Sequence, residues 1–263
     1  MAQIEQLAKK QSLAPSAYDI SREQVEIFQS LSEEEKESVN LFETLSYHFS
    51  SGVVEVLARH IPYVDFETKL HIAKEIIDEA GHFTRCASAC RLLKITPGDF
   101  FPDIRRIYGE SLNWLRFMAG CPFTLEQPSA QVFGKFLPRG NRYFVPVKPL
   151  VAEDVDHFSH AFLQLERALS VADARVAADN RVVITDAIRE SLENYAAPFF
   201  EHLTKVITLG TTIERDDVDR EWRAALTQLK KSCDKLGLEI EASEFSLLNQ
   251  SARNVRFCIQ QGG

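Results

Sequence analysis

The fold is decided by the stretch FETKLHIAKEIIDEAGHFTRCASACRLL, residues 66–93, which we predict to form one long helix. Glu79 and His82 are three residues apart, so their side chains share one helical face. A carboxylate and an imidazole in this arrangement can bind one metal ion, while Asp78 offers a second carboxylate and Glu75 extends the same stripe. The stretch predicts half of a di-iron or di-manganese carboxylate site, built where the helices of a bundle face each other.

The wording of the motif supports this interpretation over the alternative that Glu-x-x-His marks a solvated helix face. The segment Asp78-Glu79-Ala80-Gly81-His82 resembles the metal-binding helix of the ferritin-like di-iron oxygenases, most closely the phenylacetyl-CoA epoxidase catalytic subunit. The spacing from Glu43 to this segment is similar to that in the p-aminobenzoate N-oxygenases. The resemblance is strong over residues 39–93, and it implies oxygenation or N-oxygenation of a small organic molecule.

The residues before this helix predict its partner. From Ser32, a plausible N-cap, to His60 the sequence has the pattern of an amphipathic helix, with Glu43 at the edge of its apolar stripe. A carboxylate there needs a partner, because unpaired burial costs several kcal/mol or leads to protonation. Glu43 precedes Glu79 by 36 residues, so we expect both at similar depth in a helical hairpin and include Glu43 among the metal ligands.

The second half of the chain is expected to complete the site from two further helices, at residues 150–178 and 181–209. Glu166 and His202 lie on the predicted inner faces, and we take them as the ligands of the second ion. The residue three before His202 is Phe199, so the second Glu-x-x-His typical of the resembled families is missing from this helix. The remaining ligand stays open among these alternatives: Glu153, His157, His160, Glu190 and Glu193.

These patterns predict an all-α fold, a ferritin-like or haem-oxygenase-like helical bundle with additional helices. Residues 121–149 are rich in proline and aromatic side chains, and we expect a long, mostly irregular connection that covers the substrate entrance. We divide the chain into an N-terminal arm at 1–20, one helical-bundle domain at 21–250 and a C-terminal tail at 251–263.

Composition bounds the class of protein. The 263 residues, 45% hydrophobic and 26% charged, are those of a globular protein, and the net charge of −8 argues against nucleic-acid binding. We find neither a signal sequence nor a membrane span, and we expect a cytoplasmic location. The scattered cysteines lack zinc-type spacing and are interpreted as small buried hydrophobes.

The leading hypothesis is therefore a non-haem di-iron oxygenase or oxidase that uses two iron ions, or an iron–manganese pair, and O2. Its substrate is expected to be a small organic molecule bearing an amine or a carboxylate, in a biosynthetic pathway. An external electron donor and a homodimer are compatible with it, and no catalytic residue is assigned beyond the metal ligands. The alternative is a non-catalytic ferritin-like scaffold subunit of a multicomponent monooxygenase, and a haem-oxygenase-like di-metal oxidase is the third reading.

Overall fold

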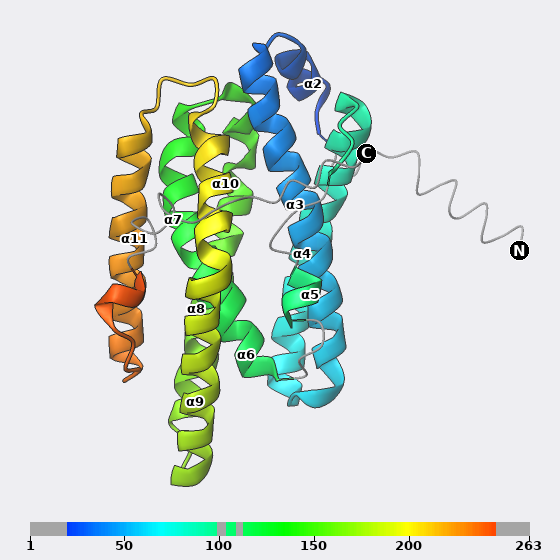
Figure 1. Cartoon of the computed structure of the whole chain (residues 1–263). Coiled ribbons are helices and arrows are strands. Elements are labelled where there is room, and N and C mark those ends of the chain that lie inside the picture. Colours follow the sequence, from blue (N-terminus) through cyan, green and yellow to red (C-terminus); the bar gives the residue numbers. More distant parts are fainter. Residues whose placement is uncertain (1–19, 99–103, 109–112, 246–263) are drawn as a thin grey trace, which may run out of the picture.

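Two long antiparallel helices, α3 (Glu33–His60) and α4 (Phe66–Leu93), form the predicted hairpin (Figure 1). Ser32 caps α3 through a capping box with Glu35, as its position predicts. Asp65 caps α4 by accepting the backbone N–H of Thr68 at 2.9 Å. Each helix begins where a side-chain oxygen satisfies an otherwise unpaired N–H group.

The computed structural model describes residues 20–98, 104–108 and 113–245, and no β-strand occurs among them. The all-α class is therefore confirmed, whereas the ferritin-like bundle stays a prediction. The predicted arm at 1–20, apart from Ile20, and the predicted tail at 251–263 lie outside the described residues. In the described part of the chain, no helix combines the length and apolarity that crossing a membrane requires.

The other helices pack around this hairpin (Figure 1). Helix α10 contacts α3, α7 lies between α8 and α11, and α8 and α9 both contact η2. The α-helices and π-helical segments besides the hairpin are α2 (Arg22–Gln29), α5 (Ile104–Tyr108), α6 (Trp114–Met118), η2 (Ala119–Glu126), α7 (Gln127–Phe136), α8 (Lys148–Leu169), α9 (Ala174–Ser191), η5 (Leu192–Ala196), α10 (Ala197–Thr208) and α11 (Arg215–Lys235). The short 3₁₀ turns are η1 (Ile61–Tyr63), η3 (Leu137–Arg139), η4 (Arg142–Val147) and η6 (Ala242–Phe245).

The prediction of an irregular connection at 121–149 is wrong, because most of this segment is helical. Its prolines occupy positions that a helix tolerates. Pro122 lies inside the π-helical segment η2, whose wider turn lets the N–H of Gln127 reach the Pro122 carbonyl. Pro128 falls in the first turn of α7, where its missing N–H has no partner to lose. Proline content alone was therefore a misleading signal.

The predicted turn at Asp179–Asn180 is also wrong, since both residues lie inside α9. The chain turns earlier, and Asp173 caps α9 by accepting the N–H of Arg175 at 2.9 Å. The Asn180 amide donates to the Ala168 carbonyl at 2.8 Å, so a residue typical of turns ties two helices together instead.

Gly120 allows η2 to approach its neighbours closely. Its carbonyl accepts a hydrogen bond from the Ser191 hydroxyl at 3.0 Å, and that hydroxyl contacts the Tyr108 hydroxyl at 2.8 Å. A Cβ at Gly120 would lie only 2.9 Å from Ser191 Oγ and 2.8 Å from Tyr108 Cε1. All three residues are buried, so the clash has no open space to relax into.

We predict that Gly120→Ala lowers the free energy of unfolding by about 1–3 kcal/mol, the usual cost of overpacking. Gly134→Ala in α7 is the control, because the added Cβ would meet Val151 at an ordinary 3.8 Å and alanine favours a helix by roughly 0.5–1 kcal/mol. Urea denaturation of both variants measures the difference. Equal stability of the two variants would contradict the close packing of η2.

Candidate metal centre

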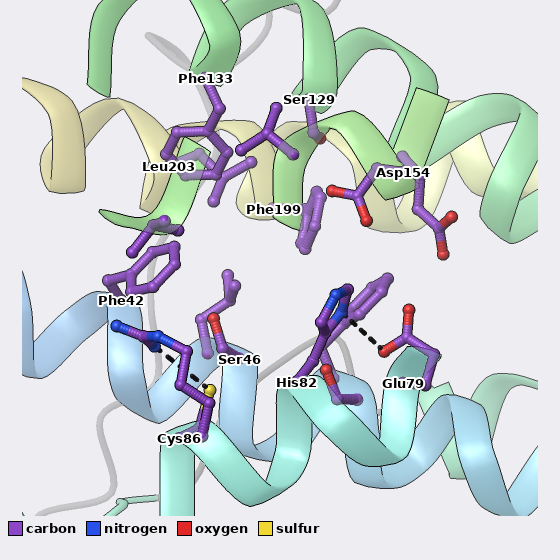
Figure 2. Close-up of a pocket in the computed structure, with 17 residues that line it drawn as sticks. Phe42, Ser46, Glu79, His82, Cys86, Ser129, Phe133, Asp154, Phe199 and Leu203 are labelled. Atoms are coloured by element: carbon purple, nitrogen blue, oxygen red, sulfur yellow. Dashed lines mark hydrogen bonds and ion pairs between the residues drawn. The ribbon is translucent and has the colours of Figure 1, made fainter. Parts of the chain in front are cut away.

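Three side chains with metal-binding atoms converge between α4 and α8. Glu79 and His82 come from α4 and Asp154 comes from α8, and one potential ligand atom of each lies within 4.8 Å of those of the others. Figure 2 shows the three side chains pointing toward one another at one end of a cavity. Glu79 and His82 are 2% and 7% exposed, so the predicted Glu-x-x-His pair is turned inward and not toward solvent.

His157 and Glu126 extend this group. His157 lies one turn after Asp154 on α8, and its Nδ1 is 3.7 Å from Glu79 Oε1 and 3.6 Å from Glu126 Oε2. His82 Nδ1 is 3.6 Å from the other oxygen of Glu79, Oε2. The two oxygens of Glu79 therefore face two different histidines, which is the geometry of a carboxylate that can bridge two ions.

Several of these atoms are buried without a hydrogen-bond partner in the described structure: Glu79 Oε2, Glu126 Oε2 and His157 Nε2. A buried polar atom left without a partner costs about 1–3 kcal/mol, so such atoms are rare unless they serve a ligand or an ion. Here an acceptor atom of each carboxylate and a ring nitrogen converge on the same space. The donor set of carboxylate oxygens and imidazoles is that preferred by Fe(II), Mn(II) and Zn(II). The residues present therefore fit a metal centre.

The electrostatics of the histidines point the same way. Burial lowers the pKa of His82, but Glu79 raises it by more, to about 9. Burial likewise lowers the pKa of His157, which Glu126 and Glu79 raise to about 11. The metal-free centre thus holds protons on its imidazoles, in positions where divalent cations would compensate the same carboxylates.

The carboxyl groups respond in two directions. Burial raises the pKa of the Glu79 carboxyl, but His82 and His157 lower it by more, so its pKa lies below the usual value. Burial raises the pKa of Glu126 and of Asp154, and for Asp154 the charge of Glu126 adds to the effect. Too much negative charge is gathered here for all the groups to ionise without a cation.

Two outer contacts orient the centre. His82 Nε2 lies 2.7 Å from Glu153 Oε2, which leaves Nδ1 directed at Glu79. A carboxylate on the far ring nitrogen fixes the orientation of a ligating histidine and raises its basicity. Cys121 Sγ donates to Glu126 Oε1 at 3.5 Å and so holds the carboxylate whose Oε2 faces His157.

Glu43, predicted as a ligand, lies elsewhere. It is fully buried, and its carboxylate accepts from Arg85 Nη1 at 3.0 Å and from the Tyr143 hydroxyl at 2.9 Å. The register of the hairpin explains the difference: Glu43 lies opposite Arg85, while Ser50, two turns further along α3, lies at the level of Glu79. The expectation that Glu43 and Glu79 sit at equal depth is therefore corrected.

Glu166 and His202 are not brought to the centre either. Glu166 is exposed on α8, and His202 Nε2 contacts the Leu41 carbonyl at 3.0 Å, linking α10 to α3. Burial lowers the pKa of His202, consistent with a neutral imidazole in that role. Of the residues first taken as ligands, the structure brings together Glu79 and His82.

Among the alternatives left open, His157 lies in the centre and Glu153 supports it. His160 lies further along α8, with Nδ1 2.7 Å from Glu75 Oε1. Glu190 pairs with Arg116, and Glu193 is exposed.

Sequence reasoning missed Asp154 and Glu126, and it placed His157 on an outward face. One signal was present: Asp154-x-x-His157 repeats the spacing of Glu79-x-x-His82. Glu126 had no such signal, because only the π-helical course of η2 directs it inward.

A cavity of about 80 Å³ adjoins the centre. Glu79, His82 and Asp154 line one end, and Figure 2 shows Phe42, Phe133 and Leu203 gathered at the other. The remaining lining residues are Leu45, Ser46, Phe49, Ser50, Arg85, Cys86, Glu126, Ser129, Val147, Val151 and Phe199. A small, mostly apolar molecule can therefore lie against the metal-binding side chains.

Comparison of the chain with protein-family models, with curated proteins and with solved structures found no match. The geometry of the centre carries the functional argument.

We predict that Glu79→Gln abolishes tight binding of divalent metal, because it removes the carboxylate shared by both histidines. The matched control is Glu166→Gln, which changes an exposed glutamate predicted as a ligand from the sequence alone. Metal content after anaerobic loading with Fe(II) and gel filtration measures both. Loss of metal in the Glu166 variant, with retention in the Glu79 variant, would reverse the assignment.

A second prediction separates Glu43 from the centre. Glu43→Leu leaves the buried Arg85 without its partner and should lower the free energy of unfolding by about 3–5 kcal/mol. The double variant Glu43→Leu/Arg85→Met should recover most of that loss and bind the same amount of metal as the unmodified chain. Denaturant titration and metal analysis check the two statements, and a folded double variant that loses metal would show that Glu43 is a ligand.

Proposed function

We propose that this protein is a non-haem di-metal oxygenase or oxidase that activates O2 and acts on a small organic substrate. The observation that supports it best is the pairing of Glu79-x-x-His82 with Asp154-x-x-His157 across the seam between α4 and α8. Two carboxylate-x-x-histidine pairs on facing helices are the core of the di-iron and di-manganese carboxylate sites of helical bundles.

Two ions can be accommodated by the donors present. One position would be held by Glu79, His82 and Asp154, and the other by Glu126, His157 and the second oxygen of Glu79. Iron ions bound there would supply the capacity to bind and reduce O2 at open coordination positions. We favour iron because of the resemblance around Glu79, with manganese as the alternative for one position.

The protein side chains would provide orientation and a dry site. Glu153 holds His82 by its outer nitrogen, and Cys121 holds Glu126. The phenylalanines of the cavity keep water from the metal-binding side chains, and this protects reactive species from side reactions. Arg85 also lines the cavity, but the carboxylate of Glu43 balances its charge.

The size of the cavity limits the substrate. About 80 Å³ is less than the roughly 150 Å³ of an engineered apolar cavity that binds benzene. We therefore expect a compact substrate or one that enters by displacing cavity side chains. An apolar portion would pack against Phe42 and Phe133, and its reacting atom would lie near Glu79 and Asp154.

The donors come from three helical segments: α4, the η2 segment and α8. The ferritin-like arrangement draws one further carboxylate from a fourth helix, whereas α3 presents Ser50 at this level. A haem-oxygenase-like di-metal oxidase therefore remains a structural alternative within the same functional class.

The scaffold hypothesis is the competing function. It was motivated by Phe199, which stands where the resembled families carry a ligand. Phe199 stacks on Phe49 with ring centroids 5.5 Å apart and lines the cavity. Because Asp154 and His157 offer the second carboxylate-x-x-histidine pair elsewhere, the departure at Phe199 no longer argues against a metal centre.

The test is anaerobic loading with Fe(II) followed by mixing with O2. We expect about two irons per chain and a transient, oxygen-dependent absorbance change, both lost in an Asp154→Asn/His157→Gln double variant. A protein that loads iron but consumes no O2 would support a storage or structural role for the metal. Failure to bind iron, manganese or cobalt would leave the scaffold function.

A further inference from the structure

A second group of potential metal ligands lies along the same seam, one turn outward from the centre. His160 Nδ1 on α8 is 2.7 Å from Glu75 Oε1 on α4. The His160 ring stacks on His71 with centroids 4.0 Å apart, and its Nε2 is 3.2 Å from the Gln164 amide. We name His71, Glu75 and His160 the outer cluster.

The outer cluster connects solvent with the centre. His71 and His160 are partly exposed, whereas Glu75 is only 5% exposed. Glu75 is one helical turn before Glu79, a rise of roughly 6 Å, so it is close to the centre without belonging to the converging ligand group. Its charge raises the pKa of Glu126 and of Cys121, which shows that Glu75 also faces inward.

Two imidazoles and a carboxylate form a ligand set for divalent first-row transition metals. Burial lowers the pKa of His71, and His160 lowers it further, so the His71 imidazole is neutral at physiological pH. Neutral imidazole is the form that binds a metal. The contact between Glu75 and His160 is a hydrogen bond through a proton, and an ion with ligand distances of about 2 Å can take the place of that proton.

The chain has a physical reason for such a group at this place. A buried centre rich in carboxylates attracts cations, but a hydrated divalent ion must lose its water on the way in. Ligands at half depth replace that water stepwise, and a negatively charged cleft raises the association rate of cations by roughly 10- to 1,000-fold.

We propose that His71, Glu75 and His160 form an outer binding site for divalent first-row metal ions, from which ions pass to the centre. The inference rests on the proposed di-metal function, and the outer site itself can be tested without enzymatic activity.

The experiment uses Co(II) with the metal-free, full-length protein. Equilibrium dialysis gives the number of bound ions, and stopped-flow absorbance gives the rate at which the centre is loaded. The test variant is His71→Gln/His160→Gln, with His48→Gln as the matched control because His48 lies on α3 and contacts the Gly98 carbonyl at 2.7 Å. A single His71→Gln variant, which removes only the stacked ring, covers the case in which the double variant fails to fold.

The double variant should fill the centre to the same final level but roughly tenfold or more slowly, and it should lose the weaker additional ion. His71→Gln should show the same slowing to a smaller extent, and His48→Gln should load at the unmodified rate. Unchanged loading rate and stoichiometry in a folded double or single variant would overturn the proposal.

Glu79→Gln separates the two levels of inference. If it loses the centre's ions but keeps one ion that His71→Gln/His160→Gln removes, both proposals stand. If it loses every ion and the histidine variants load normally, the outer site fails while the proposed function stands. If it binds as the unmodified chain does, the centre fails, and the outer site is judged by the histidine variants alone.

Discussion

Burial of carboxylates inside a helical bundle is the constraint on which this structure depends. Glu43, Glu79 and Glu126 are each at most 4% exposed, and an isolated ionised carboxylate at such depth is far too costly to remain unpaired. Every buried carboxylate must therefore meet a cation, hold a proton or bind a metal. The helices around them are arranged so that each carboxylate finds one of these solutions.

The chain uses two different solutions on the same pair of helices. Glu43 is compensated internally by Arg85 and the Tyr143 hydroxyl, and all three groups are locked in hydrogen bonds. Glu79 and Glu126 instead face histidines at 3.6–3.7 Å, and each keeps one buried oxygen without a partner. The first arrangement needs nothing from outside the protein. The second is incomplete as it stands, and this difference separates a structural ion pair from a metal centre.

The sequence allowed α4 and its inward-facing Glu79 and His82 to be predicted, because caps and short-range spacing determine a long helix and its faces. It misled on α8, where apolar residues occur on several sides. The stripe chosen from Val155 and Phe158 made Glu166 appear inward, yet Val155 is 50% exposed and His157 is 4% exposed. Which side of such a helix is buried depends on neighbours distant in sequence. The register that places Ser50 rather than Glu43 beside Glu79 is another property of packing that spacing along one chain does not determine.

The course of the chain through η2 shows why part of the centre could not be found from the sequence. Proline and glycine at 120–122 predict a break, and the structure uses them to form a π-helical segment that continues into α7. A π turn packs its backbone less favourably than an α turn and is rare unless a side chain must be placed where regular spacing would not put it. Here the side chain is Glu126, held by Cys121 from within the same segment and aimed at His157. The irregularity that hid this residue from pattern analysis is therefore the feature that brings it into the centre.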